Sequence, residues 1–137
     1  MRCKWVICCE RVDLAPGASG LPRATLVGIF DRHAADSLPT RLDGLCIVFR
    51  IDAPELDPLD SHDVRMVIFG PRETRSRPIE GRLRLGMDGQ AIWPFELPSP
   101  VQFDEAGWQA VTLWVDGQVV CEEEPFLLIV PPEEPRP

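Results

Sequence analysis

Prolines and glycines interrupt this chain so often that it has little room for a helix. The sequence contains 15 prolines and 10 glycines, which divide it into short apolar segments at intervals of roughly 8 to 12 residues. Proline fixes φ and lacks a backbone N–H, so it ends helices and interrupts central strands. Few windows have a helical period, and short strands between turns at this spacing are typical of a sandwich. The sequence predicts an all-β, two-layer antiparallel β-sandwich, Ig-like or jelly-roll-like, of seven or eight strands.

Alternating apolar side chains locate the strands. This pattern predicts strands over residues 4–11, 24–32, 44–52, 62–69, 79–86 and 90–97. Pro94 in the last of these predicts an edge strand or a bulge. Asp116-Gly117 between two apolar runs predicts a C-terminal hairpin, because both turn positions favour positive φ. Residues 1–130 are expected to form one domain, and the Pro/Glu-rich tail 131–137 is expected to be disordered.

The composition limits the classes of partner. The formal net charge is −8, which repels the phosphate backbone, so nucleic-acid binding is not expected. No apolar run approaches the ~18 residues of a membrane helix. The apolar run at 5–9 is too short for a signal peptide. We therefore expect a cytoplasmic protein without a membrane partner.

The five cysteines are expected to be free, buried thiols. They are odd in number and lie in apolar strand patterns, which is typical of a reducing compartment. Cys8 and Cys9 are sequence neighbours, so their side chains would face opposite sides of a strand. No paired C-x-x-C motif supports a zinc site, and no metal or cofactor is expected. The cysteines are Cys3, Cys8, Cys9, Cys46 and Cys121.

The stretch LVGIFDRHAADSLPT (26–40) raises the question of an active site. Strand 24–32 is apolar on both faces, which predicts a central strand, and Gly28 indicates close approach by a large side chain such as Trp5 or Trp114. Asp31 is expected to end the strand and accept backbone N–H bonds, with His33 in a polar loop. The alternative is a catalytic Asp–His pair acting on Cys46 or Ser37. No nucleophile elbow accompanies it, so no enzyme is predicted.

The segments WVICCERVDL (5–14) and ATLVGIFDRHAADSLPTR (24–41), with the Gly-rich turn between them, resemble a family of small bacterial proteins classified only as a domain of unknown function. The resemblance implies a β-sandwich and no assigned catalytic residue. In the corner before the hairpin, Trp108 stands where a tyrosine is expected. The residues that match the family pattern are Gly28, Phe30, Asp31, Leu38, Pro39 and Gly117.

Three further segments are candidate sites. PRETRSRPIEGRLR (71–84) carries five arginines that would suit a phosphate, a nucleotide or an acidic partner, unless they only occupy the wet face of a hairpin. Trp93 and Phe95 would be either interface anchors or a cap on the core. The acidic loop DAPELDPLDSHD (52–63) would be either a calcium ligand set or a solvated loop. The arginines are Arg72, Arg75, Arg77, Arg82 and Arg84.

Together these features predict a non-enzymatic, cytosolic protein-interaction module that self-associates through an edge strand, since edge strands have unpaired backbone groups. Its partner would be another protein or a second copy of the chain. One alternative is a small-ligand or nucleotide binder that uses the arginines of 71–84. Another is an acidic inhibitor or immunity-type protein that caps a basic partner.

Overall fold

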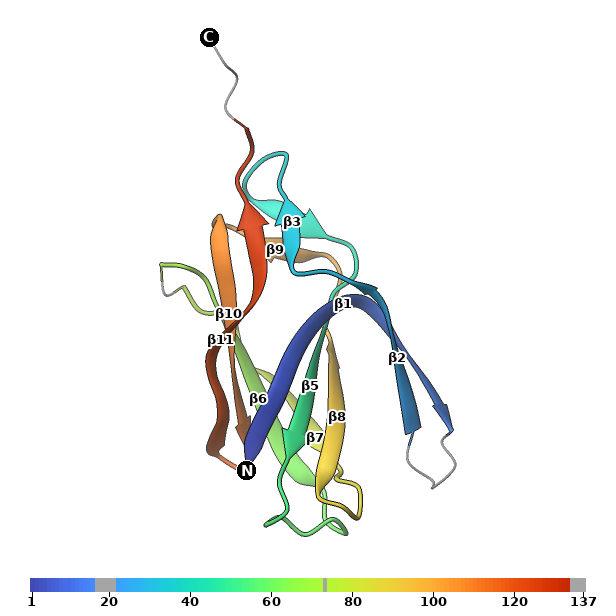
Figure 1. Ribbon diagram of the computed structural model, residues 1–137. Helices are drawn as coiled ribbons and strands as arrows, with labels where there is room; N and C mark the ends of the chain where they lie inside the picture. Colours follow the sequence, from blue (N-terminus) through green and yellow to red (C-terminus); the bar gives the residue numbers. More distant parts are fainter. Residues whose placement is uncertain (17–21, 73, 134–137) are drawn as a thin grey trace.

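The computed structural model describes residues 1–16, 22–72 and 74–133, which form strands and connecting turns with no helix among them (Figure 1). Among the described residues, none forms a helix with the length and hydrophobicity needed to span a membrane. The strands are β1 (Arg2–Pro16), β2 (Pro22–Ile29), β3 (Arg32–Ala34), β4 (Thr40–Leu42), β5 (Cys46–Asp52), β6 (His62–Phe69), β7 (Ile79–Leu83), β8 (Gln90–Glu96), β9 (Val101–Phe103), β10 (Gly107–Val115) and β11 (Gln118–Val130).

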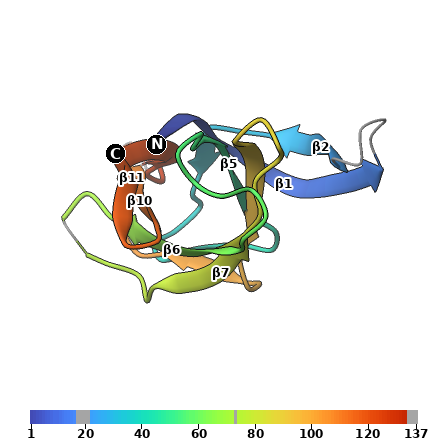
Figure 2. The same cartoon turned by 90° about the horizontal axis from the view of Figure 1, so that it is seen from below.

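Two curled sheets make up the body of the molecule. Sheet A has the order β2-β1-β5-β8, sheet B has the order β3-β11-β10-β6-β7, and β4 pairs with β9 in a small third sheet. All ladders are antiparallel except β3–β11, which is parallel. Seen from below, the two sheets curve around a shared interior (Figure 2). The prediction of an all-β, antiparallel fold is confirmed.

The described residues contain 11 strands rather than seven or eight. β3, β4 and β9 each have only three residues. A segment of that length is too short to carry a recognisable period of two, so the sequence pattern does not reveal it. β8 lies at the edge of sheet A, as Pro94 predicts.

The core lies between the two sheets. Phe49 of β5, Met66 of β6 and Leu113 of β10 are completely buried there. Along β5, Ile47, Phe49 and Ile51 all point inward, as their spacing predicts. Burying one such side chain contributes about 1.5–3 kcal/mol relative to leaving it exposed.

A second apolar cluster lies on the outer face of sheet A. Cys9, Cys46 and Val48 are buried there beneath Val12 and Leu26. Cys8, the neighbour of Cys9, belongs to the main core instead. The two adjacent cysteines therefore face opposite sides of β1, as the alternation predicts.

The C-terminal hairpin has the turn that its sequence predicts. Asp116 and Gly117 both have positive φ, at 48° and 78°, and they join β10 to β11. Residues 131–133 lie outside any strand. The rest of the predicted disordered tail, and most of the turn before β2, lie outside the described residues.

Candidate functional site

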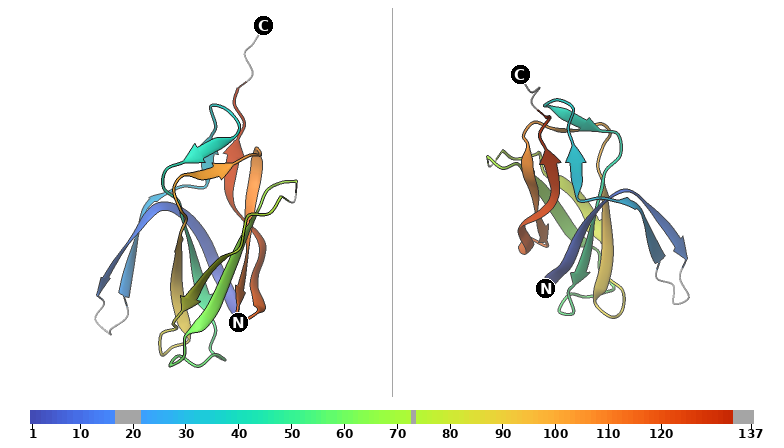
Figure 3. Two further views of the ribbon diagram at one scale, coloured as in Figure 1. Left: turned by 180° about the vertical axis from the view of Figure 1, so that it is seen from behind. Right: turned by 45° about the horizontal axis from the view of Figure 1, so that its top comes forward.

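The most prominent surface feature is a two-stranded arm. β1 pairs with β5 only as far as Cys9, which lies opposite Cys46. From Cys9 onward β1 pairs with β2 instead, and the hairpin projects away from the body of the molecule (Figures 1 and 3). We call residues 10–16 of β1 together with β2 the β-arm. Within the described residues, β2 pairs with no strand other than β1.

The edge of β2 is the least protected among the four edges of the main sheets. β8 contains Pro94, β3 has only three residues, and β7 carries charged Glu80 and Arg82. Proline, short length and charge are the usual devices that prevent pairing between sheet edges. β2 has eight residues with the sequence PRATLVGI, and Arg23 is its only charged residue.

The β-arm exposes apolar side chains. Ile29 is 62% exposed and Leu14 is 58% exposed. Leu26, by contrast, packs on the outer cluster of sheet A. Leu14 lies over a hollow of about 170 Å³ between the β-arm and β8, which Arg50 and Ile92 also line. The β-arm therefore anchors one part of its surface on sheet A and leaves the rest in solvent.

The segment 24–32 is an edge strand and a crossover, so the prediction of a central strand is wrong. At its end, the carbonyl of Asp31 accepts the N–H of Leu128 at 2.8 Å. The chain thereby leaves sheet A and joins sheet B, where Arg32 pairs with Leu128. One face of this segment covers the outer cluster through Leu26, while the other leaves Ile29 exposed.

Gly28 lies where the β-arm joins the body of the molecule, and the side chain that packs closest to it is that of Glu10. Gly28 has a φ of +69°, and a Cβ at this position would lie 2.7 Å from Cδ of Glu10. The prediction that Trp5 or Trp114 covers Gly28 is therefore wrong. Neighbouring Phe30 packs against the main core.

Asp31 and His33 are not partners of each other. The Asp31 carboxylate accepts a hydrogen bond from Arg32 Nε at 3.1 Å, rather than from backbone N–H groups as predicted. His33 Nε2 and Thr40 Oγ1 share a hydrogen bond of 3.0 Å, and Thr40 is buried. Cys46 is buried in the outer cluster. The structure therefore does not bring Asp31, His33 and Cys46 together, as the catalytic alternative would require.

The five arginines of 71–84 do not converge. The Arg75 guanidinium lies 5.3 Å from the centre of the Phe69 ring. Arg82 donates a hydrogen bond to Ser61 at 2.8 Å. Arg84 lines the hollow beneath the β-arm, while Arg72 donates its backbone N–H to Glu105. A single anion site built from all five is excluded, because only Arg82 lies on β7 and the other four lie on the segments before and after that strand.

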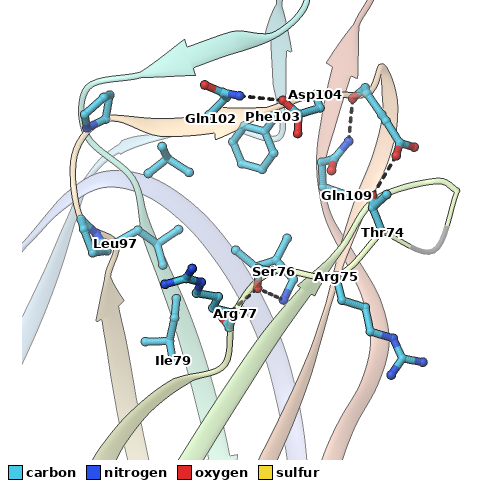
Figure 4. A pocket seen from close by; sticks show the side chains of 16 residues that line it. Thr74, Arg75, Ser76, Arg77, Ile79, Leu97, Gln102, Phe103, Asp104 and Gln109 are labelled. Carbon is cyan, nitrogen blue, oxygen red and sulfur yellow. Dashed lines mark hydrogen bonds between the residues drawn. The ribbon is translucent and has the colours of Figure 1, made fainter.

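Arg77 lies in a groove of about 730 Å³ at the upper end of the sheets (Figure 4). The groove has an apolar wall that includes Ile79, Leu97 and Phe103. Figure 4 shows the Arg77 side chain directed toward Leu97, whereas that of Arg75 points away. No carboxylate pairs with Arg77 among the residues that the structure describes.

The opposite wall of the groove is polar and held in place by its own hydrogen bonds. The Glu105 carboxylate accepts hydrogen bonds from Thr74 Oγ1 at 2.8 Å and from the Arg72 N–H at 3.0 Å. Gln109 donates its side-chain amide to the carbonyl of Glu105 at 3.0 Å. The groove is therefore preformed, with the Arg77 guanidinium on one side and the hydrogen-bonded carboxylate of Glu105 on the other.

Trp93 and Phe95 cap the core. Phe95 is only 5% exposed, and its ring packs edge-on against Phe49 and Trp93, with centroids 5.8 and 5.7 Å away. Trp93 is half-buried and lies close above Gly81, where a Cβ would be 3.1 Å from the indole. Phe95 is thus not an exposed interface anchor. Trp108, by contrast, is exposed on β10.

The loop 52–63 is held by a histidine. His62 is buried, with Nδ1 2.6 Å from Asp116 Oδ2 and Nε2 2.8 Å from the carbonyl of Asp57. The carbonyl of Asp57 and the Asp116 carboxylate raise the pKa of His62, and the histidine in turn lowers the pKa of Asp116. In the described part of the chain, no three acidic, histidine or cysteine side chains gather as a metal site. The partners are 54 residues apart, so no local signal in the sequence could have revealed this contact.

These features define a small all-β protein with a projecting β-arm and an open groove at one end. No protein-family model matches the chain, and no curated protein or solved structure matches it either. The resemblance to a family of unknown function stays a prediction.

Proposed function

We propose that this protein is a non-enzymatic interaction module that self-associates through the β-arm. The observation that carries the proposal is the outer edge of β2, which is long, nearly uncharged and unpaired within the described residues. Such an edge is a template for another strand, because its backbone donors and acceptors lack partners. Pairing by strand addition takes its affinity from main-chain hydrogen bonds, and exposed apolar side chains such as Ile29 add burial.

The partner that we propose for this edge is a second copy of the chain, and charge limits where two copies can meet. The protein has a formal net charge of −8, so two copies repel each other over most of their surfaces. In the β-arm, however, Glu10 and Asp13 balance Arg11 and Arg23. The neutral β-arm is therefore the place where two copies meet with the least repulsion. Antiparallel pairing of two β2 strands about a two-fold axis near Leu26 gives a self-complementary interface.

Light scattering coupled to size-exclusion chromatography tests this proposal. The wild-type chain is expected to elute as a dimer, and Ile29→Lys is expected to shift it to the monomer, because antiparallel pairing about an axis near Leu26 places each introduced lysine opposite Arg23 of the second copy. Val119→Lys is the matched control, since Val119 is also apolar and 50% exposed but lies on β11 beside the hairpin turn. A wild-type monomer at all concentrations, or an equal effect of both variants, would contradict the proposal.

The groove supports a second candidate, a site for a small amphipathic anion. It combines an apolar wall with the Arg77 guanidinium, and ligand pockets usually have this composition of mostly apolar lining with a few polar groups. A carboxylate with a short hydrocarbon chain would match it, its head on Arg77 and its chain along Leu97 and Phe103.

Thermal melting in the presence of decanoate tests the groove. Bound ligand stabilises the folded state, so we expect a rise in Tm of about 2–5 °C at saturating ligand. Arg77→Gln is expected to abolish this rise, whereas Arg72→Gln should preserve it, because Arg72 does not line the groove. An unchanged Tm in the wild type, or an equal rise in Arg77→Gln, would exclude this site.

A further inference from the structure

The two main sheets meet at a seam between β1 and β11. The two strands lie against each other there, yet among the described residues no ladder pairs them. Cys3 of β1 and Cys121 of β11 lie at the seam and line the same hollow, and each thiol donates a hydrogen bond to a backbone carbonyl of its own sheet. A hollow of about 220 Å³ opens onto both cysteines, and its other lining residues include Lys4, Trp5 and Glu122.

The two thiols of the seam differ in exposure and in pKa. Cys3 is partly exposed, and its interaction with the neighbouring Cys121 side chain is the main cause that lowers the pKa of the Cys3 thiol. The same interaction, together with burial, raises the pKa of Cys121. The thiolate is the nucleophilic form of cysteine, so the partly exposed Cys3 is the better placed of the two thiols to react. The sequence pattern predicts buried, inert cysteines throughout, and Cys3 is the exception.

The other close pair of cysteines lacks this asymmetry. Cys9 and Cys46 are opposite each other in the β1–β5 ladder and are both buried. Burial raises the pKa of Cys9 to about 11 and also raises that of Cys46. Cys8 is buried as well, and desolvation raises its pKa to about 12. These three thiols are protonated at neutral pH and enclosed by apolar side chains.

We propose that Cys3 and Cys121 form an oxidisable dithiol site whose oxidant is a peroxide. The Cys3 thiolate attacks one oxygen of hydrogen peroxide and the O–O bond breaks, so that Cys3 becomes a sulfenic acid. The hydroxide that leaves takes up a proton and becomes the first water. The Cys121 sulfur then attacks the Cys3 sulfur, the S–O bond breaks, and the hydroxyl leaves with the Cys121 proton as a second water. Two thiols are oxidised to one disulfide, and one peroxide is reduced to two waters.

The disulfide would join sheet A to sheet B at a seam that has no ladder among the described residues. It would close a loop that spans nearly the whole chain, and cross-links between residues far apart in sequence restrict the unfolded state most strongly. Oxidation would therefore stabilise the closed arrangement of the two sheets, and thiol reductants would reverse it.

Mass spectrometry of the full chain treated with one equivalent of hydrogen peroxide tests the site. We expect a loss of about 2 Da as two hydrogens leave, with one cross-linked peptide pair that contains Cys3 and Cys121. The Tm of the oxidised protein is expected to rise by roughly 5–15 °C. Dithiothreitol should restore both the mass and the Tm.

Two variants separate this site from general oxidation. Cys121→Ser removes the resolving thiol, so dimedone should then label Cys3 as its sulfenic acid, which the wild type would not accumulate. Cys9→Ser is the control, and it should form the same cross-link as the wild type. A cross-link between Cys9 and Cys46, a disulfide between two chains, or labelling of another cysteine in Cys121→Ser would each overturn the proposal.

Discussion

Replacement of Phe49 by alanine is expected to lower the free energy of unfolding by about 3–5 kcal/mol, the range for removing a buried phenylalanine ring. Phe49 is completely buried between the sheets, and its ring packs edge-on against Phe95 with centroids 5.8 Å apart. The substitution removes the transfer free energy of the ring and leaves a cavity that the two sheets fill only in part. Whole domains have free energies of unfolding of roughly 5–15 kcal/mol, so this substitution is expected to remove a large share of the stability of the fold.

Urea unfolding followed by tryptophan fluorescence measures this effect. Ile92→Ala is the control, because Ile92 lies on the neighbouring strand β8 but is 36% exposed. We expect that variant to lose less than about 1.5 kcal/mol. Equal losses in the two variants would show that the core does not lie between β5 and the opposite sheet.

The second large effect is expected at the contact between His62 and Asp116. Asp116→Ala removes the carboxylate that bonds Nδ1 of His62 at 2.6 Å and the N–H of Asp63 at 2.9 Å. It also places alanine at a φ of 48°, a conformation that asparagine tolerates better. Hydrogen bonds to charged groups contribute about 1.5–3 kcal/mol, and we expect a loss in this range. Asp116→Asn should lose less, since it keeps the turn and an acceptor.

This contact also predicts how stability depends on pH. The pKa of His62 is raised above its ordinary 6.5, so its contribution is complete below about pH 6.5 and is lost as the pH rises through the pKa of the folded state. The pKa of Asp116 is lowered below its ordinary 3.8, so its contribution is present above about pH 4 and is lost as the pH falls through the lowered value. The contact therefore stabilises the fold most between about pH 4 and 6.5.

Melting curves from pH 4 to pH 9 measure this dependence. The wild type is expected to lose stability above pH 6.5, and Asp116→Asn should show a weaker slope there. Asp88→Asn is the control, because Asp88 also accepts a backbone N–H in a turn, from Gln90, without a histidine partner. The same slope in the wild type and in Asp116→Asn would mean that the two residues are not linked.

Several sites could not be predicted because their residues are far apart in the sequence. Cys3 and Cys121, like His62 and Asp116, meet only after strands from different parts of the chain have paired, and no local pattern indicates which strands will pair. The arginines of 71–84 show the reverse case. They are close in the sequence, but they lie before, on and after β7 and contact different parts of the molecule.

The sequence by itself determined the all-β class, the C-terminal hairpin at Asp116-Gly117 and the inward face of β5, because these features depend on local turn chemistry and on the two-residue period of a strand. Only the tertiary structure decided that β1 leaves β5 after Cys9 and continues into the β-arm. An apolar stretch such as 24–32 has the same pattern whether it is buried in the centre of a sheet or exposed at its edge. Which of these it becomes depends on the strands available to pair with it.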